Sequence, residues 1–333
     1  MTSTSIQDPE EMPGRHPARF NAKRYIRRLL PYTLLAVLVV EYLIFVAIQP
    51  GTFLTTDALT TILSSQAPLL IAALALTVTL IVHEFDLTIG ANLVFVDVMV
   101  AALTVNEGLS LLPAVIIALA LGTLVGVING LLVVRVGIDS FIATLGMSTL
   151  LTGIGLWAAG STIISNVPRG LVLVAGTQVV GIPLVVFYAF GIAAVLWYVL
   201  THLPVGRYLY FVGANQEVAR LAGVRSSRIK FGAFVAGAFI ASIAGIMEAG
   251  TVGSADPTAG PSFLLPAFAA AFLGATAVRI GKFNIWGTMI ASYLLFTGIT
   301  GLALLGQTGW VQDAFNGLAL LTAVIAARFA RRT

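Results

Sequence analysis

The chain has 333 residues, of which 58% are hydrophobic and 10% are charged, whereas soluble domains carry about 25% charged residues. The net charge is +4, but the basic residues form short clusters without interleaved aromatic residues, which excludes a nucleic-acid-binding surface. The absence of cysteine excludes disulfides, thiolate catalysis and cysteine-based metal sites.

Long apolar blocks follow one another along the chain, each close to the roughly 20 residues that cross a bilayer as a helix. Residues 1–28 are polar and basic, and the block Leu29–Ile48 is too long for the core of a cleavable signal peptide, so it predicts an uncleaved signal-anchor helix. The other predicted spans are Ile62–Val82, Ile89–Val105, Leu111–Val134, Phe141–Ala159, Ile182–Leu200, Phe231–Ala249, Leu264–Val278, Trp286–Leu305 and Trp310–Arg328. The predicted fold class is an all-α polytopic membrane protein of about ten transmembrane helices. It forms one membrane domain over residues 29–328, followed by a tail at 329–333.

The basic residues set the predicted orientation of these spans. Cytoplasmic loops of membrane proteins collect Lys and Arg, and a single inside–outside path places every Lys and Arg except Arg169 on the same side. We therefore expect both termini and the loop Thr201–Lys230 in the cytoplasm. Gly160–Gly181, which could hold a short helix or cap, and Gly250–Phe263 are expected outside.

Polar residues inside the apolar blocks are candidates for a translocation path. Ser64, Ser65, Gln66 and Pro68 interrupt the second span and predict a broken helix, which survives at membrane depth only beside protein or water. Ionisable groups in a span are costly unless they are paired or face water. The candidate path residues are Ser64, Ser65, Gln66, Asn92 and Asp97.

Each of these polar residues also has a structural explanation. For Asp97, a buried hydrogen bond between helices and a place in the path remain equally open. For Glu41 in the first span, the hydrogen bond is favoured. Asp86 stands before the third span and could cap that helix or act in a gate.

Small residues predict close helix packing. Gly122, Gly126 and Gly130 lie four residues apart in the fourth span, and Gly237, Ala241 and Gly245 repeat this spacing in the seventh. Such grooves let backbones approach closely. Packing within the chain is favoured over an interface between subunits.

The segment Gly213–Val224 predicts a short amphipathic helix outside the membrane. Asn215 is a good N-cap, Gln216 and Glu217 suit the first turn, and Gly223 suits a left-handed stop. Val218, Leu221 and Ala222 form an apolar stripe, and Arg207, Arg225 and Arg228 flank the helix. It could dock a cytosolic protein or lie at the lipid interface, and the residues alone favour neither.

Five segments resemble, in the same order, sequences of the monosaccharide-type permeases of ATP-binding cassette importers, which serve ribose, xylose, arabinose and galactose uptake. In Gly213–Val224, Asn215, Arg220, Leu221 and Gly223 match the family, while Ala214, Gln216 and Glu217 stand where Gly, Glu and Ala are usual. The likeness covers roughly residues 30–330, and five ordered motifs make chance agreement implausible. The other similar segments are Asp86–Gly90, Phe141–Gly146, Asp256–Gly260, and Gly281-Lys282 together with Ile285–Thr288.

The resemblance implies a ten-helix importer permease in the bacterial inner membrane, with both termini cytoplasmic. It implies three protein partners: a second permease subunit, a cytosolic ATPase and a periplasmic sugar-binding protein. A homodimer is expected, and a heterodimer stays open. The helix that docks on the ATPase would consist of Asn215, Gln216, Glu217, Val218, Arg220, Leu221, Ala222 and Gly223. ATP and Mg²⁺ would be held by the ATPase and not by this chain.

The residues offer no catalytic or metal site. A phosphate-binding loop ending at Gly281-Lys282 would need glycine where Thr276 stands, and His83-Glu84 lacks the second histidine of a metalloprotease motif because position 87 is Leu87. Two alternatives to a sugar importer remain. One is an ion-coupled transporter with Asp97, Glu41, Asp86 and Glu84 as ion ligands, and the other is an importer of another cargo, such as branched-chain amino acids or autoinducer-type sugars.

Overall fold

The computed structural model describes the backbone of residues 30–306 and 309–330. The predicted basic segment 1–28 and residues 331–333 of the tail lie outside the described residues. The helices are α2 (Thr33–Ile48), α3 (Pro50–Phe53), α4 (Thr56–Ser65), α5 (Ala67–Ile81), α6 (Thr88–Ala101), α7 (Leu111–Leu131), α8 (Ser140–Ala158), α9 (Arg169–Gly176), α10 (Leu184–His202), α11 (Pro204–Ala214), α12 (Gln216–Leu221), α13 (Ser226–Val252), α14 (Gly260–Gly274), α15 (Ile285–Leu304) and α16 (Trp310–Ala330). A short 3₁₀ turn, η1 (Leu30–Tyr32), precedes α2, and π-helical turns η2 (Ala102–Asn106) and η3 (Leu132–Val136) extend α6 and α7.

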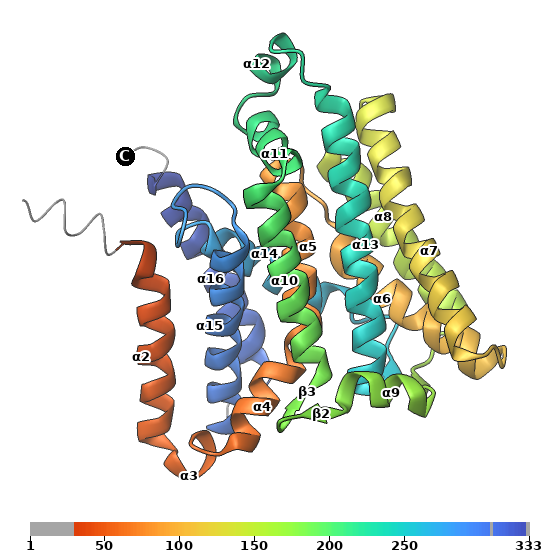
Figure 1. Ribbon diagram of the computed structural model, residues 1–333. Helices are drawn as coiled ribbons and strands as arrows, with labels where there is room; N and C mark the ends of the chain where they lie inside the picture. Colours follow the sequence, from red (N-terminus) through yellow and green to blue (C-terminus); the bar gives the residue numbers. More distant parts are fainter. Residues whose placement is uncertain (1–29, 307–308, 331–333) are drawn as a thin grey trace, which may run out of the picture.

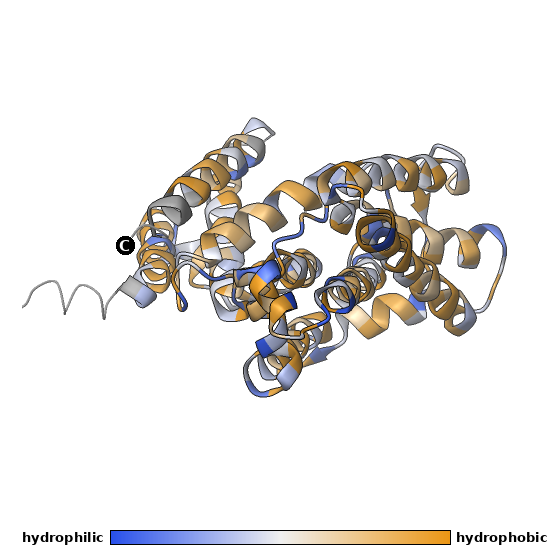
Figure 2. Cartoon of the chain, turned by 90° about the horizontal axis from the view of Figure 1, so that it is seen from above, coloured by the Kyte–Doolittle hydropathy of each residue, from blue (hydrophilic) through white to orange (hydrophobic). Residues whose placement is uncertain are grey.

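The long helices form one bundle with α5, α6 and α13 at its centre (Figure 1). Helices α7 and α8 cover the centre on one side, and α2, α15 and α16 lie on the other, with α14 linking the two halves. Viewed along the bundle, the helices are largely hydrophobic (Figure 2). Outer helices such as α7 expose large apolar side chains, including Leu112 and Ile116, which is typical of surfaces in contact with lipid.

Every predicted span has a helix at its place. Six described helices are long and apolar enough to cross a membrane, and a bent pair could form a seventh span. Helices α2 and α14 have only 16 and 15 residues, or about 24 and 22 Å of helix, less than the roughly 30 Å hydrocarbon core. The polytopic all-α class is confirmed, whereas the count of ten remains a prediction.

The second predicted span is broken where the sequence indicated. Helices α4 and α5 meet at Gln66 and are bent by 41°. Pro68 lies in the first turn of α5, where its missing N–H costs no hydrogen bond. The polar residues of this segment therefore sit at the junction of two helices and not inside one continuous span.

The connections at the two ends of the bundle are themselves structured. Between α8 and α10, the strand β1 (Ile164–Ser165) pairs with β4 (Ser254–Ala255), and β2 (Gln178–Val179) pairs with β3 (Ile182–Pro183) around α9. This agrees with the short helix or cap expected over Gly160–Gly181. At the opposite end, the expected loop Thr201–Lys230 is mostly helical, because α11 and α12 fill it and α13 begins at Ser226.

The glycine stripes pack helices within this chain, as favoured from the sequence. A Cβ atom at Gly126 would lie 2.5 Å from the Cβ of Ala238 and 2.6 Å from the carbonyl oxygen of Phe234 in α13. On the other side of α13, a Cβ atom at Gly245 would collide with the carbonyl oxygen of Leu93 in α6. Helix α13 is therefore held between α7 and α6 by contacts that only glycine allows.

We expect Gly245→Val to destabilise the fold by about 3 kcal/mol, the upper end of the overpacking range, because the backbone of α6 cannot yield as a side chain can. The measurement is the yield and thermal midpoint of detergent-solubilised, monodisperse protein. Gly232→Val is the matched control, since position 232 is in the same helix and has nothing within 4 Å of its Cβ direction. Equal behaviour of the two variants would show that the α6–α13 contact does not limit stability.

Candidate functional site

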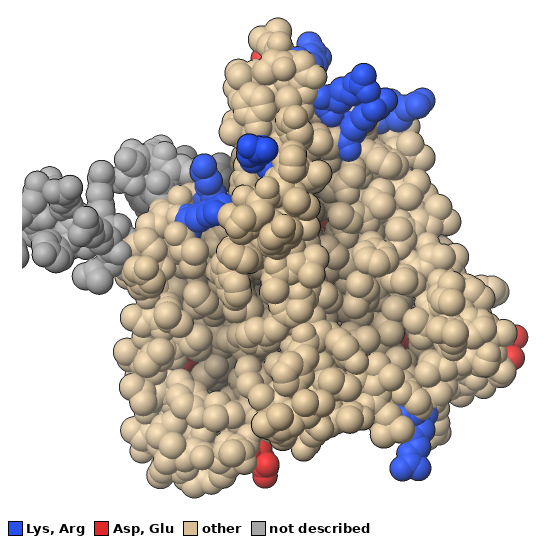
Figure 3. All heavy atoms as spheres, in the orientation of Figure 1, with Lys and Arg blue, Asp and Glu red and all other residues tan. Residues whose placement is uncertain are grey.

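Most of the basic residues that the structure describes gather at one end of the bundle, which we call the basic end (Figure 3). This end carries α11, α12, the start of α13 and the connection between α14 and α15 (Figure 1). The described Lys and Arg residues of these elements are Arg207, Arg220, Arg225, Arg228, Lys230, Arg279 and Lys282. Arg169 begins α9 at the opposite end, which matches its place as the exception in the sequence.

Helix α12 projects from the basic end (Figure 1). The Asn215 side chain caps it by accepting the N–H groups of Glu217 and Val218, each at 3.0 Å, and Gly223 follows in the left-handed region with φ of 82°. Both capping predictions are confirmed. Ala219 faces inward and is fully buried, whereas Leu221 is 86% exposed.

The apolar stripe of α12 therefore has no cover within the described part of the chain. Val218 is 49% exposed, and Ala222 is also exposed. A leucine with this exposure at the tip of a capped helix contributes little to the fold, so the stripe is available for a partner.

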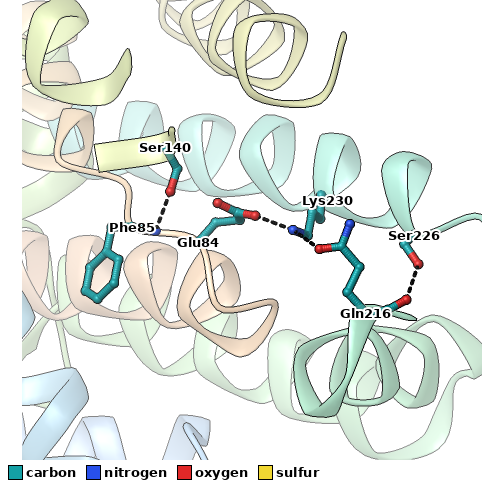
Figure 4. A network of polar contacts seen from close by, with 6 residues as sticks. All are labelled: Glu84, Phe85, Ser140, Gln216, Ser226 and Lys230. Atoms are coloured by element: carbon teal, nitrogen blue, oxygen red, sulfur yellow. Dashed lines mark hydrogen bonds and ion pairs between the residues drawn. The ribbon is translucent and has the colours of Figure 1, made fainter. Parts of the chain in front are cut away.

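A largely buried ion pair attaches α12 to the centre of the bundle (Figure 4). The Nζ of Lys230 in α13 lies 2.5 Å from Glu84 Oε1 and donates to Gln216 Oε1 at 2.6 Å. The Lys230 and Glu84 side chains are only 16% and 10% exposed. One ammonium thus joins the first residue of α12 to the connection between α5 and α6.

This α5–α6 connection, residues 82–87, is where the sequence motifs meet. The Phe85 N–H donates to Ser140 Oγ at 3.3 Å, and the Leu87 N–H donates to Thr144 Oγ1 at 3.1 Å, both at the start of α8. Gly213 at the end of α11 packs directly on the backbone of Ile81. Segments far apart in the sequence therefore converge on one short connection.

The motif Asp256–Gly260 reaches the same region from the other end of the bundle. A Cβ atom at Gly90 would lie 2.6 Å from the carbonyl oxygen of Gly260, at the start of α14. The residues between β4 and α14 form a non-helical turn, in which the Ala259 N–H donates to the Asp256 carbonyl oxygen at 3.2 Å and Asp256 Oδ1 accepts the Thr258 N–H at 2.8 Å. Such backbone is tolerated at membrane depth only against protein or water.

Asp86 caps α6 from one residue before its N-cap position. Its Oδ1 accepts the Thr88 N–H at 3.0 Å and also the Thr88 hydroxyl, which in turn accepts from Asn129 Nδ2 at 3.0 Å. Burial raises the pKa of the Asp86 carboxyl to about 6, while the hydrogen bonds from Thr88 act in the opposite direction. This geometry supports the capping role, and a gating role stays a prediction.

The candidate path residues do not form one cluster. Asn92 Nδ2 donates to the carbonyl oxygen of Ala238 at 3.0 Å in α13, so this side chain serves helix packing. Asp97 is 3% exposed, and its Oδ1 has no hydrogen-bond partner among the described residues. Ser64, Ser65 and Gln66 lie at the α4–α5 junction, and no hydrogen bond found among the described residues joins them to Asp97.

The hydrogen bond favoured for Glu41 is absent among the described residues. Its Oε2 has no hydrogen-bond partner there. Its Oε1 packs against Gly298 of α15, since a Cβ atom at that glycine would lie 2.5 Å from this oxygen. Among the described residues, α15 presents glycine at this contact and no donor to the carboxyl is found, so the expected hydrogen bond stays a prediction.

We expect Asp97→Asn to lower uptake at least tenfold while leaving the amount of folded, inserted protein unchanged. The amide keeps the shape of the side chain but removes a buried acid, and such acids in spans mark transport paths. The measurement is substrate uptake normalised to inserted protein. Glu107→Gln, which removes an exposed acid just after the same helix, is the control. A parallel loss of inserted protein and uptake would assign Asp97 to structure alone.

Two polar anchors were missed by the sequence reasoning. One is the Glu84–Lys230–Gln216 network, whose only signal was opposite charge at the ends of two spans on the same side. The other is Asn284, which donates to the carbonyl oxygens of Gly274 and Ala277 and accepts the Gly287 N–H at 2.8 Å. Within the described residues, no group of three or more His, Asp or Glu side chains could hold a metal ion.

Known proteins similar to this chain are importer permeases. The family model described as the permease component of branched-chain amino acid transport systems matches residues 58–324. The ribose import permease protein of Escherichia coli K12 is 32% identical over 311 residues, which cover 92% of this chain and 96% of that protein. The D-allose transport system permease protein of the same strain is 28% identical over 305 residues, 92% of this chain and 93% of that protein.

A third relative, the autoinducer 2 import system permease protein of Salmonella typhi, is 28% identical over 282 residues, 85% of this chain and 81% of that protein. No solved structure matches the chain. The ion-coupled transporter considered from the sequence has no support in these likenesses. Because the family model covers most of the chain and the ribose permease aligns with nearly all of it, this chain belongs to the family of permease subunits of ATP-binding cassette importers.

Proposed function

We propose that this chain forms the translocation path of an importer for a monosaccharide or a closely related small polyol. Its cargo would be delivered by a periplasmic binding protein, and ATP would be hydrolysed by a separate cytosolic ATPase. The relatives named above import ribose, D-allose and autoinducer 2, which supports a small hydroxyl-rich cargo over a branched-chain amino acid. The path would lie between two copies of the chain in the inner membrane.

The observation that carries the proposal is the exposed apolar face of α12 at the basic end. A carrier that works alone has no need for a capped helix projecting from the membrane, whereas a permease must hold its ATPase there. In this proposal Val218, Leu221 and Ala222 enter a groove of the ATPase, with Glu217 and Arg220 at the polar rim. The ion pair between Lys230 and Glu84 then connects this helix with the centre of the bundle.

Affinity purification of the tagged chain from its native membrane tests the proposal. We expect an ATPase subunit and, in the presence of cargo, a periplasmic binding protein to co-purify. The recovered binding protein should bind a monosaccharide and not leucine. Purification of the chain without any ATPase, together with uptake that depends on an ion gradient, would overturn the proposal.

We also expect the basic end to face the cytoplasm, because Lys and Arg are retained on that side. Single cysteines can be introduced at Ser227 and Val180, which are exposed at opposite ends of the bundle. Neighbouring Ser226 would report poorly, because it is 4% exposed. In sealed cells, a membrane-impermeant thiol reagent should label the cysteine at position 180 and not the one at 227. Labelling of the cysteine at position 227 and not of the one at 180 would show that the basic end faces the outside, which would contradict the proposed orientation.

A further inference from the structure

The basic end contains a second feature, a recess set apart from α12. It lies between the end of α10, the middle of α11 and the connection between α14 and α15, and it encloses about 540 Å³. Three of its lining residues are cations, namely Arg207, Arg279 and Lys282. We call this cavity the basic recess.

The cations of the basic recess have no acidic partner among the described residues, where the ion pair found is that of Lys230 with Glu84. Tyr210 also lines the recess, and its hydroxyl donates to the carbonyl oxygen of Phe283 at 2.9 Å. Three positive charges facing one cavity repel one another, so an anion bound between them would be stabilised.

Part of the lining of the recess is apolar. Leu200 and Ile280 line it together with the cations. Apolar lining does not stabilise a soluble anion such as inorganic phosphate. It does stabilise an amphiphile, which has apolar chains attached to a charged head.

The position of the recess along α10 indicates the level of lipid headgroups. Just before it in α10, Trp197 contacts Trp286 of α15 at 6.0 Å between ring centroids, and Tyr198, which is 53% exposed, stacks on His202. Tryptophan and tyrosine collect at the membrane–water interface. Nearer the start of α10, Phe187 and Val195 are also exposed, so this helix offers apolar surface to acyl chains.

We propose that the basic recess binds the phosphate headgroup of an anionic phospholipid. The phosphate lies between Arg279, Lys282 and Arg207, and the acyl chains follow the exposed face of α10. Basic pockets between transmembrane helices at this level are a known mode of headgroup recognition. The site is independent of cargo and of the ATPase, so it can be tested on the permease alone.

The test is native mass spectrometry of the purified full-length chain titrated with phosphatidylglycerol or phosphatidylcholine. We expect the wild-type chain to retain phosphatidylglycerol in preference to phosphatidylcholine. The double variant Arg279→Gln/Lys282→Gln should weaken phosphatidylglycerol binding about 30-fold, from about 1 kcal/mol for each basic contact. The charge-conserving variant Arg279→Lys/Lys282→Arg should retain it.

The matched control is Arg225→Gln/Arg228→Gln, which removes the same charge from exposed positions at the same end but outside the recess. This control should bind phosphatidylglycerol like the wild type. Equal weakening in both double variants would overturn the proposal in favour of general attraction to a basic surface. Displacement of the lipid by an equal concentration of inorganic phosphate would assign the recess to a soluble anion. If Arg279→Gln/Lys282→Gln no longer co-purified with the ATPase but bound lipid like the wild type, the basic recess would belong to the ATPase interface.

Discussion

Replacing Leu221 with aspartate is expected to abolish uptake without reducing the amount of permease in the membrane. Leu221 is 86% exposed, so the fold loses almost nothing when it changes. In complex with an ATPase, burial of a leucine contributes about 1.5–3 kcal/mol, and the aspartate adds an unpaired charge to the same interface. The loss corresponds to at least a tenfold weakening of ATPase binding, measured by co-purification and by ATP-driven uptake in proteoliposomes.

Val180→Asp is the matched control for this variant. Val180 is 94% exposed, but it lies in the β2–β3 turn at the opposite end of the bundle. The same change of an exposed apolar residue to aspartate should leave ATPase binding intact there. Wild-type ATPase binding and uptake by Leu221→Asp would remove α12 from the ATPase interface and favour a helix that lies on the lipid surface.

Much of the fold could be predicted because membrane helices follow from local sequence. Ten apolar blocks predicted helices at ten places, and the break beside Gln66 followed from its polar neighbours and Pro68. Helix α12 was predicted together with both ends, since Asn215 and Gly223 determine caps through their own backbone and side-chain geometry. The stripes at Gly126 and Gly245 identified close-packed faces before any partner helix was known.

The features that could not be predicted from the sequence depend on contacts between segments that are distant in the chain. Hydropathy predicted a span over Leu264–Val278, but α14 begins at Gly260, directly after a turn at residues 256–259, and its first residue packs against Gly90 of α6. Grouping Asn92 with Asp97 assumed a shared path, whereas Asn92 bonds to α13. The Lys230–Glu84 pair joins residues separated in the chain by seven α-helices, α6 to α12, and no local pattern specifies such a pairing.

Replacing Lys230 with glutamine is expected to uncouple the importer rather than release its ATPase. The change removes the ammonium shared by Glu84 and Gln216 and leaves the Glu84 carboxylate nearly buried without a partner. Breaking a fully buried pair costs about 3–5 kcal/mol, and the residual exposure of this pair reduces the cost to about 2 kcal/mol. Because the apolar face of α12 is untouched, the ATPase should still bind and hydrolyse ATP. The cargo imported per ATP hydrolysed in proteoliposomes should fall several-fold.

Two variants separate coupling from folding in this experiment. Arg228→Gln removes a cation from an exposed position in the first turns of α13, and it should keep the wild-type ratio. The exchange Glu84→Lys/Lys230→Glu restores an ion pair of reversed sense, and the Gln216 amide can then donate to the new carboxylate, so part of the coupling should return. If Lys230→Gln imported as much cargo per ATP hydrolysed as the wild type, the Glu84–Lys230–Gln216 network would have a role in stability alone. A drop in the thermal midpoint that the exchange does not repair would also contradict a role in coupling. Coupling between α12 and the α5–α6 connection requires an ion pair between positions 84 and 230 but not a particular sense of the two charges.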